Sequence, residues 1–191
     1  METPRQACWL IRKIFDSRKW YGGNDLCEDL QQLTNAGKFM IKKLALQRRL
    51  STADRMAKWG IQVPMNCVLC NADTEETHTH LFFECDYSRK MWSSFLRWIG
   101  DNRQVGTWEE EIERLTTKQC NSRAHAEVLG WLLAATVYHV WNERNARRFQ
   151  EQQQECASRL REITIQLHRK GQFRSNWNRL LDSLNSYPSL V

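Results

Sequence analysis

The sequence predicts a mainly α-helical protein, a small helical bundle interrupted by one short non-helical insert. The first observation is that apolar residues recur at helical spacing along most of the 191-residue chain. The second is the segment 67–85, CVLCNADTEETHTHLFFEC, in which C-x2-C is followed by H-x4-C. This pattern is typical of a zinc knuckle, and it leaves room for a small β-hairpin at the metal. Three prolines and eight glycines are too few for a long disordered linker.

Basic amphipathic helices are expected in the first part of the chain. Residues 8–20 and 38–50 each carry apolar side chains at roughly helical spacing, with Lys and Arg between them. Ser51 or Thr52 can cap a short following helix, which ends at Gly60 because glycine readily adopts the left-handed conformation.

Further helices are expected after the insert. One begins at Ser88 and ends at Gly100. Thr107 and Glu110 form a capping-box pattern that opens another, which runs to about Leu115. The last three expected helices cover 122–149, a stripe from Cys156 to Leu167, and a shorter stripe from Trp177 to Leu184. Their helical spacing favours core burial of the tryptophans Trp92, Trp98, Trp131 and Trp141.

Three segments follow from this order of elements. They are a basic helical N-terminal segment (1–62), a zinc-binding module with its following helix (63–100), and a helical C-terminal segment (101–191). The net charge of +6 is concentrated in the first part, where residues 1–66 carry twelve Lys/Arg against six Asp/Glu. Such an excess attracts phosphate backbones, although many proteins of this size match it.

Composition also excludes some classes of protein. No stretch of about 20 apolar residues exists, so a membrane-spanning helix and a membrane partner are not expected. The N-terminus lacks the apolar core of a signal peptide, which predicts an intracellular protein with reduced thiols. Seven cysteines, an odd number, then indicate metal ligation with spare thiols rather than a disulfide framework.

Four residues of the insert form the predicted metal site: Cys67, Cys70, His80 and Cys85. Thiolate and imidazole are ligands that zinc prefers, and four protein ligands leave no open position for a substrate water. The sequence therefore predicts one structural Zn²⁺. His78 is the rival to His80; we favour His80 because Leu81 and the two phenylalanines after it can anchor the ligand in the core.

The remaining cysteines, Cys8, Cys27, Cys120 and Cys156, have no partner spacing and are expected to be small apolar residues on helix faces, with Cys8 and Cys156 the better core candidates. Catalytic residues are not expected. No Asp-Asp pair of the kind that holds two metal ions for nucleotidyl transfer occurs in the chain, and no Gly-rich phosphate loop is present. The sequence thus predicts a protein that is not an enzyme.

Motifs around the ligands resemble a known family. They are R-L-S-T-A-D-R-M-A-K-W-G (49–60), C-V-L-C (67–70), E-T-H-T-H-L-F-F-E-C (76–85) and S-R-K-M-W (88–92). The stretch 49–92 strongly resembles the zinc-binding domain that follows the reverse transcriptase in plant LINE-type (non-LTR) retrotransposons. Trp9 to Ile14 and the run W-N-E-R-N (141–145) with Phe149 resemble its flanking elements.

The resemblance implies that the same four residues are the zinc ligands, and that the chain is such a domain standing alone, without its polymerase. It also implies nuclear residence and a reverse transcriptase acting in trans. The chain departs from the family before Arg49, where lysines occupy a segment that the family fills with an aromatic-rich helix.

Three interpretations of the function remain open. The first interpretation is a nucleic-acid-binding accessory module that contacts RNA or single-stranded DNA through basic residues beside the metal, which are Lys42, Lys43, Arg48, Arg49, Arg55 and Lys58. The alternatives are a zinc-stabilised protein–protein interaction module and an inactive remnant of a retroelement. The cations Arg144, Arg147 and Arg148 fit either binding role, or simply stabilise the C-terminal end of a helix.

Overall fold

A computed structural model describes residues 34–35, 38–39, 45–70, 72–116, 122–184 and 186–190. The chain divides into two compact units, residues 1–49 and 50–191, and the metal segment lies in the second. The helices of the second unit are α4 (Ala53–Lys58), the π-helical turn η1 (His80–Glu84), α5 (Asp86–Trp98), α6 (Trp108–Thr116), α7 (Arg123–Gln150), α8 (Cys156–Gly171), the 3-10 turn η2 (Ser175–Trp177) and α9 (Asn178–Ser183). The mainly helical fold class is confirmed; the three-segment division stays a prediction.

In the first unit, the helix predicted over 38–50 is wrong at its start. Strand β1 (Thr34–Asn35) pairs antiparallel with β2 (Lys38–Phe39), and Thr34 lies opposite Phe39. Only two residues separate the strands, as in the tightest β-hairpins. Phe39 thus belongs to a strand rather than to the helical stripe assigned to it. The helix predicted over 8–20 lies outside the described residues.

Several helix ends follow local signals. Thr107 accepts a hydrogen bond from the Glu110 backbone N–H (3.4 Å), and the Glu110 carboxylate accepts one from the Thr107 N–H (2.9 Å), so the capping box opens α6 as predicted. The Ser122 hydroxyl caps α7 by accepting from the His125 N–H. Gly60 and Gly100 follow the ends of α4 and α5 with φ of +72° and +83°, a conformation that favours glycine.

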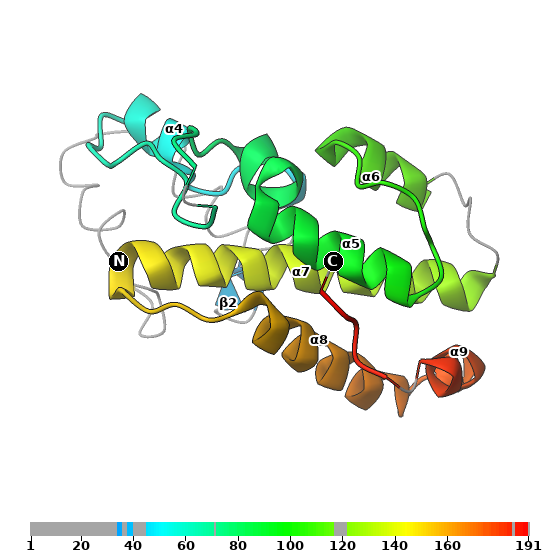
Figure 1. Ribbon diagram of the computed structural model, residues 1–191. Coiled ribbons are helices and arrows are strands. Elements are labelled where there is room, and N and C mark those ends of the chain that lie inside the picture. Colours follow the sequence, from blue (N-terminus) through cyan, green and yellow to red (C-terminus); the bar gives the residue numbers. More distant parts are fainter. Residues whose placement is uncertain are drawn as a thin grey trace. The chain divides into compact units, whose positions relative to one another are not determined.

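The core of the second unit forms around α7, which packs against α5, α6 and α8 (Figure 1). Trp92 of α5, Trp108 of α6 and Trp141 of α7 are buried, so the predicted burial holds for Trp92 and Trp141. Trp98 and Trp131 are only half-buried. The Trp98 indole N–H donates to the carbonyl of Ser186, in the segment after α9, at 2.7 Å.

Two buried carboxylates tie helices of the core together. Glu111 of α6 accepts from the Trp92 indole at 2.9 Å and from both terminal nitrogens of Arg103 at 2.6 Å. Glu143 of α7 accepts from Arg147 at 2.8 Å and from Arg159 of α8 at 3.1 Å. Among the described residues, no helix combines the length and the apolar character needed to cross a membrane.

Candidate metal centre

The first two ligands lie on a minimal hairpin that precedes η1. Asn66 and Glu75 form a single antiparallel β-bridge, and the Cys67 N–H donates to the Thr74 carbonyl at 2.9 Å. This is the small β-structure for which the sequence left room. Inside the turn, the backbone N–H groups of Leu69 and Cys70 donate to the Cys67 sulfur, and that of Ala72 donates to Cys70. Such bonds stabilise thiolates, the form in which cysteine binds metals.

The other two ligands lie at the two ends of η1. Residues five apart on an α-helix point about 140° apart, given 3.6 residues per turn. In η1 the Cys85 N–H donates to the His80 carbonyl at 2.7 Å. This bond closes a π-type turn and brings both residues of the H-x4-C pattern to one site. Leu81, Phe82 and Phe83 between them are all buried, so they anchor the turn in the core as predicted.

The four predicted ligands form one cluster. Their ligand atoms all lie within 4.8 Å of one another. Zinc–sulfur bonds of about 2.3 Å in a tetrahedron place two sulfurs about 3.8 Å apart, and a sulfur and an imidazole nitrogen about 3.6 Å apart. The Cys67 and Cys85 sulfurs are 3.8 Å apart, and Cys70 Sγ lies 3.4 Å from His80 Nε2. The cluster is therefore consistent with one zinc ion.

The chemistry of the donors also fits a cation. A hydrogen bond with the Cys85 thiol lowers the pKa of Cys67 to about 5, and the same bond raises the pKa of Cys85, because two adjacent sulfurs cannot both carry charge. Burial raises the pKa of Cys70. A bound zinc ion would supply the positive charge that lets all three thiols ionise, and it would leave a complex of net charge −1 with a neutral His80.

His78 is not part of the cluster. Its ring packs edge-on against Phe82 and Trp108, with centroid distances of 4.9 and 4.5 Å. His78 is buried, so its ring belongs to the aromatic part of the core. The structure thus separates the two histidines that the sequence left as rivals.

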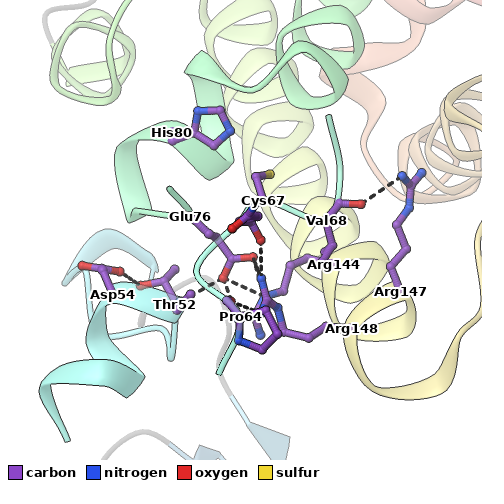
Figure 2. Close-up of polar contacts among 12 residues, drawn as sticks. Thr52, Asp54, Pro64, Cys67, Val68, Glu76, His80, Arg144, Arg147 and Arg148 are labelled. Carbon is purple, nitrogen blue, oxygen red and sulfur yellow. Dashed lines mark hydrogen bonds and ion pairs between the residues drawn. The ribbon is translucent and has the colours of Figure 1, made fainter. Parts of the chain in front are cut away.

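A buried ion pair joins the metal segment to α7 (Figure 2). The Glu76 carboxylate accepts hydrogen bonds from Arg144 Nη2 at 2.6 Å, from Arg144 Nε at 3.0 Å and from Arg148 Nη2 at 3.0 Å. The side chains of Glu76 and Arg144 are both 0% exposed. Glu76 also accepts from the Ala53 N–H at 3.0 Å, which connects the start of α4 to the same carboxylate. One carboxylate therefore holds three segments together.

The neighbouring arginines bind the backbone of the hairpin. Arg148 donates to the Pro64 carbonyl at 2.6 Å and to the Asn66 carbonyl at 2.7 Å. Arg147 donates to the Val68 carbonyl at 3.3 Å (Figure 2) and to the Leu69 carbonyl at 3.2 Å, both in the turn that carries the first two cysteines. We call Arg144, Arg147 and Arg148 the α7 arginines. They are neither free cations for a partner nor only helix-end charges, because each is engaged with the metal segment.

Groups around Arg144 offset the burial of its positive charge. Burial lowers the pKa of Arg144, but the Glu76 carboxylate and the nearby Cys67 oppose this shift. The Arg144 guanidinium also lies 4.9 Å from the Trp141 ring and 5.4 Å from the Phe149 ring. Arg144, with Trp141 and Phe149 beside its guanidinium, thus binds Glu76, a role that the sequence motifs did not reveal.

The predicted nucleic-acid-binding residues are only partly described. Lys42 and Lys43 lie outside the described residues. Arg48 and Arg49 of the first unit are exposed. In the second unit, Arg55 lies 5.2 Å from the Trp59 ring centroid and is half-buried, whereas Lys58 is exposed and 3.8 Å from Asp54.

Among the other cysteines, Cys8, Cys27 and Cys120 fall outside the described residues. Cys156 is half-buried at the start of α8, and burial raises its pKa to about 11. A thiol with a raised pKa is a poor nucleophile. Among the described residues, Cys156 does not belong to the cluster of possible metal ligands.

Residues 34–92 match the family described as zinc-binding in reverse transcriptase. The match contains all four ligands and Glu76 but ends before α7, so the α7 arginines contribute from outside it. This part of the chain is similar to a zinc-binding domain, and the match includes no catalytic domain. The link to plant LINE-type elements rests on the motifs alone. No curated protein and no solved structure matches the chain.

Proposed function

We propose that the chain is a non-catalytic accessory module that holds one structural zinc ion and binds RNA or single-stranded DNA, in support of a reverse transcriptase acting in trans. The observation that carries the proposal is a closed donor set within a reverse-transcriptase zinc-binding domain. Three sulfurs and one imidazole fill a tetrahedron, which leaves no position for a substrate or an activated water. The metal then maintains the shape of its segment, and binding depends on other side chains of the chain.

The basic residues Lys42, Lys43, Arg48 and Arg49 are the first candidates for binding nucleic acid. Arg48 and Arg49 are exposed, and the residues around them belong to the part of the chain with the largest excess of positive charge. Neutralising phosphates with such side chains releases counterions, so binding weakens as salt rises. The dependence of affinity on salt is therefore the property to measure.

The experiment is a salt-dependent titration of the full zinc-bound chain against single-stranded RNA, duplex DNA and an unrelated polyanion. The variant carries Lys42→Gln, Lys43→Gln, Arg48→Gln and Arg49→Gln. For a single strand, each lost phosphate contact lowers the salt slope by about 0.7, so four contacts lower it by about 3. Lys90→Gln with Arg97→Gln, both exposed on α5, is the matched control.

Three results would contradict the proposal. One is an unchanged slope in the quadruple variant. Another is an equal loss per charge in the α5 control, because a generic positive surface would then explain all binding. The third is a preference for the unrelated polyanion over RNA.

A further inference from the structure

We propose that the turn after α8 is a second contact surface for single-stranded nucleic acid, on which Phe173 stacks against an unpaired base while the surrounding cations bind phosphates. We call this the α8–α9 turn surface and define it by the exposed residues Arg169, Lys170, Phe173, Arg174 and Arg179. The inference rests on the proposed function but uses none of the residues assigned to it above. It is distinct from the metal centre and from the α7 arginines.

Charge is the first argument. Residues 168–179, HRKGQFRSNWNR, contain four Lys/Arg and no Asp or Glu. Favourable interaction with the helix dipole accounts for cations in the last turn of α8, which are Arg169 and Lys170. It does not account for Arg174 and Arg179, which come after the helix has ended. A segment with four cations suits the phosphates of a nucleic-acid backbone, and it keeps a net positive charge beside Glu127 of α7, which lies 4.0 Å from Arg174.

The exposure of Phe173 is the second argument. Its side chain is 84% exposed, more than that of any other large apolar residue in the described part of the chain. Single exposed apolar residues are common in proteins. This one, however, is followed at once by Arg174, and its backbone N–H donates to the Lys170 carbonyl at 3.3 Å, so the aromatic residue belongs to a turn with cations on both sides in the sequence. Proteins that bind single strands combine these two elements, with rings that stack on bases and cations that follow the backbone.

The turn that carries Phe173 is firmly held. Trp177 is buried, and its indole N–H donates to Glu127 of α7 at 2.9 Å. Asn176 donates to the same carboxylate at 3.0 Å. Gly171 packs so closely against Leu181 that a side chain there would collide with it. Phe173 is therefore exposed on an anchored turn, and a base that stacks on its ring has little ordering cost to overcome.

The geometry favours a single strand over a duplex. A ring can stack only on a base whose face is free, and bases inside a duplex are already stacked on their neighbours. The Arg174 side chain can still meet a phosphate, because it is 50% exposed, its ion pair with Glu127 is long, at 4.0 Å, and its guanidinium lies 5.8 Å from the Trp177 ring centroid. The surface lies at the end of α8 away from α4 and the metal hairpin (Figure 1), so it adds a contact and does not extend the knuckle.

The test uses fluorescence anisotropy of the full zinc-bound chain with a labelled 12-nucleotide oligo(U). Phe173→Ala should weaken binding about 5- to 150-fold, the range for loss of one base stack, while Phe173→Trp should retain binding. The control is Tyr138→Ala, which removes an aromatic ring that is 42% exposed on α7. Because Phe173 contributes almost nothing to the core, its variants should unfold at the wild-type temperature.

A second variant tests the cations. Arg169→Gln, Lys170→Gln and Arg174→Gln together should lower the salt slope for oligo(U) by about 2, whereas Lys90→Gln on α5 should lower it by much less. Vesicles that contain phosphatidylserine serve as the competing ligand.

The outcomes separate this inference from the proposed function. If Phe173→Ala leaves oligo(U) affinity unchanged while the quadruple variant at 42, 43, 48 and 49 weakens it, the α8–α9 turn surface is refuted and the proposed function stands. If the wild-type chain binds no oligonucleotide, both fail. Binding of vesicles, but not of oligo(U), that depends on Phe173 also overturns the inference, because the surface would then bind membranes.

Discussion

Replacing Glu76 by Gln should destabilise the second unit more than any surface substitution. The change keeps the size of the side chain but removes its charge and one acceptor oxygen. Arg144, which is 0% exposed, and Arg148 then lose the carboxylate that receives them at 2.6 and 3.0 Å. Removing one partner of a buried ion pair costs about 3–5 kcal/mol, because the remaining charge stays buried without compensation. Typical domains have only about 5–15 kcal/mol of stability in total.

The assay is urea unfolding at constant zinc, followed by tryptophan fluorescence. Glu75→Gln is the control, because the adjacent residue is exposed and its loss of charge should change the free energy of unfolding by less than about 0.5 kcal/mol. Combining Glu76→Leu with Arg144→Met should recover part of the loss, since no unpaired buried charge remains between the two. A cost below about 1 kcal/mol for Glu76→Gln would refute the idea that this carboxylate joins the metal segment to α7.

Three further predictions follow from the other contacts. Burial raises the pKa of Glu111, but the hydrogen bonds from Arg103 outweigh this effect, so that the pKa is lowered overall. The ionised carboxylate therefore stabilises the fold above its unfolded pKa of about 4.3. This contribution is lost as the pH falls through the lowered pKa of the folded state. Glu111→Gln should cost about 2 kcal/mol or more at pH 7 and progressively less as the pH falls below about 4, as measured by urea unfolding at each pH, and a pH-independent cost would contradict this. Thr107→Ala should cost about 1 kcal/mol in the same assay, because it removes the cap of α6, and no change would show that the cap is dispensable. Removing zinc with a chelator should abolish the ordered 64–85 segment but leave most of the far-ultraviolet helical signal, because α5, α7 and α8 lie outside it; complete unfolding would contradict a local role for the metal.

Much of the fold could be predicted because its signals are local. Thr107 with Glu110 and Ser122 each open a helix through bonds that span three residues, and Gly60 and Gly100 follow helix ends through their own backbone conformation. The amphipathic stripes of α5 and α8 likewise reflect one face of a single helix. Each of these signals lies within a few residues of the helix or helix end that it determines.

The helix expected over 38–50 shows how the same method fails. Phe39 fits a helical period with later apolar residues, but it also fits a strand, because a single position satisfies either repeat. Pairing with Thr34 decides the matter, and that pairing depends on a neighbouring strand rather than on the period. Short segments near a hairpin are therefore the hardest to assign.

The four metal ligands could be predicted from the sequence, but the residues that hold the metal segment against α7 could not. All four ligands fall within nineteen residues, so their spacing alone identifies the cluster. Glu76 and Arg144 are 68 residues apart, and each looks like an ordinary surface charge in the sequence. Both residues belong to motifs of the resembled family, which was the one available signal. The motifs nevertheless could not show that these two side chains meet.

Zinc content per chain tests the central claim most directly. The purified chain should contain one zinc ion, and His80→Ala and Cys85→Ala should each bind zinc far more weakly. His78→Ala should keep its full zinc content, because His78 packs against Trp108 outside the cluster. Absence of zinc from the wild-type chain, or zinc lost in His78→Ala and retained in His80→Ala, would contradict the site described here.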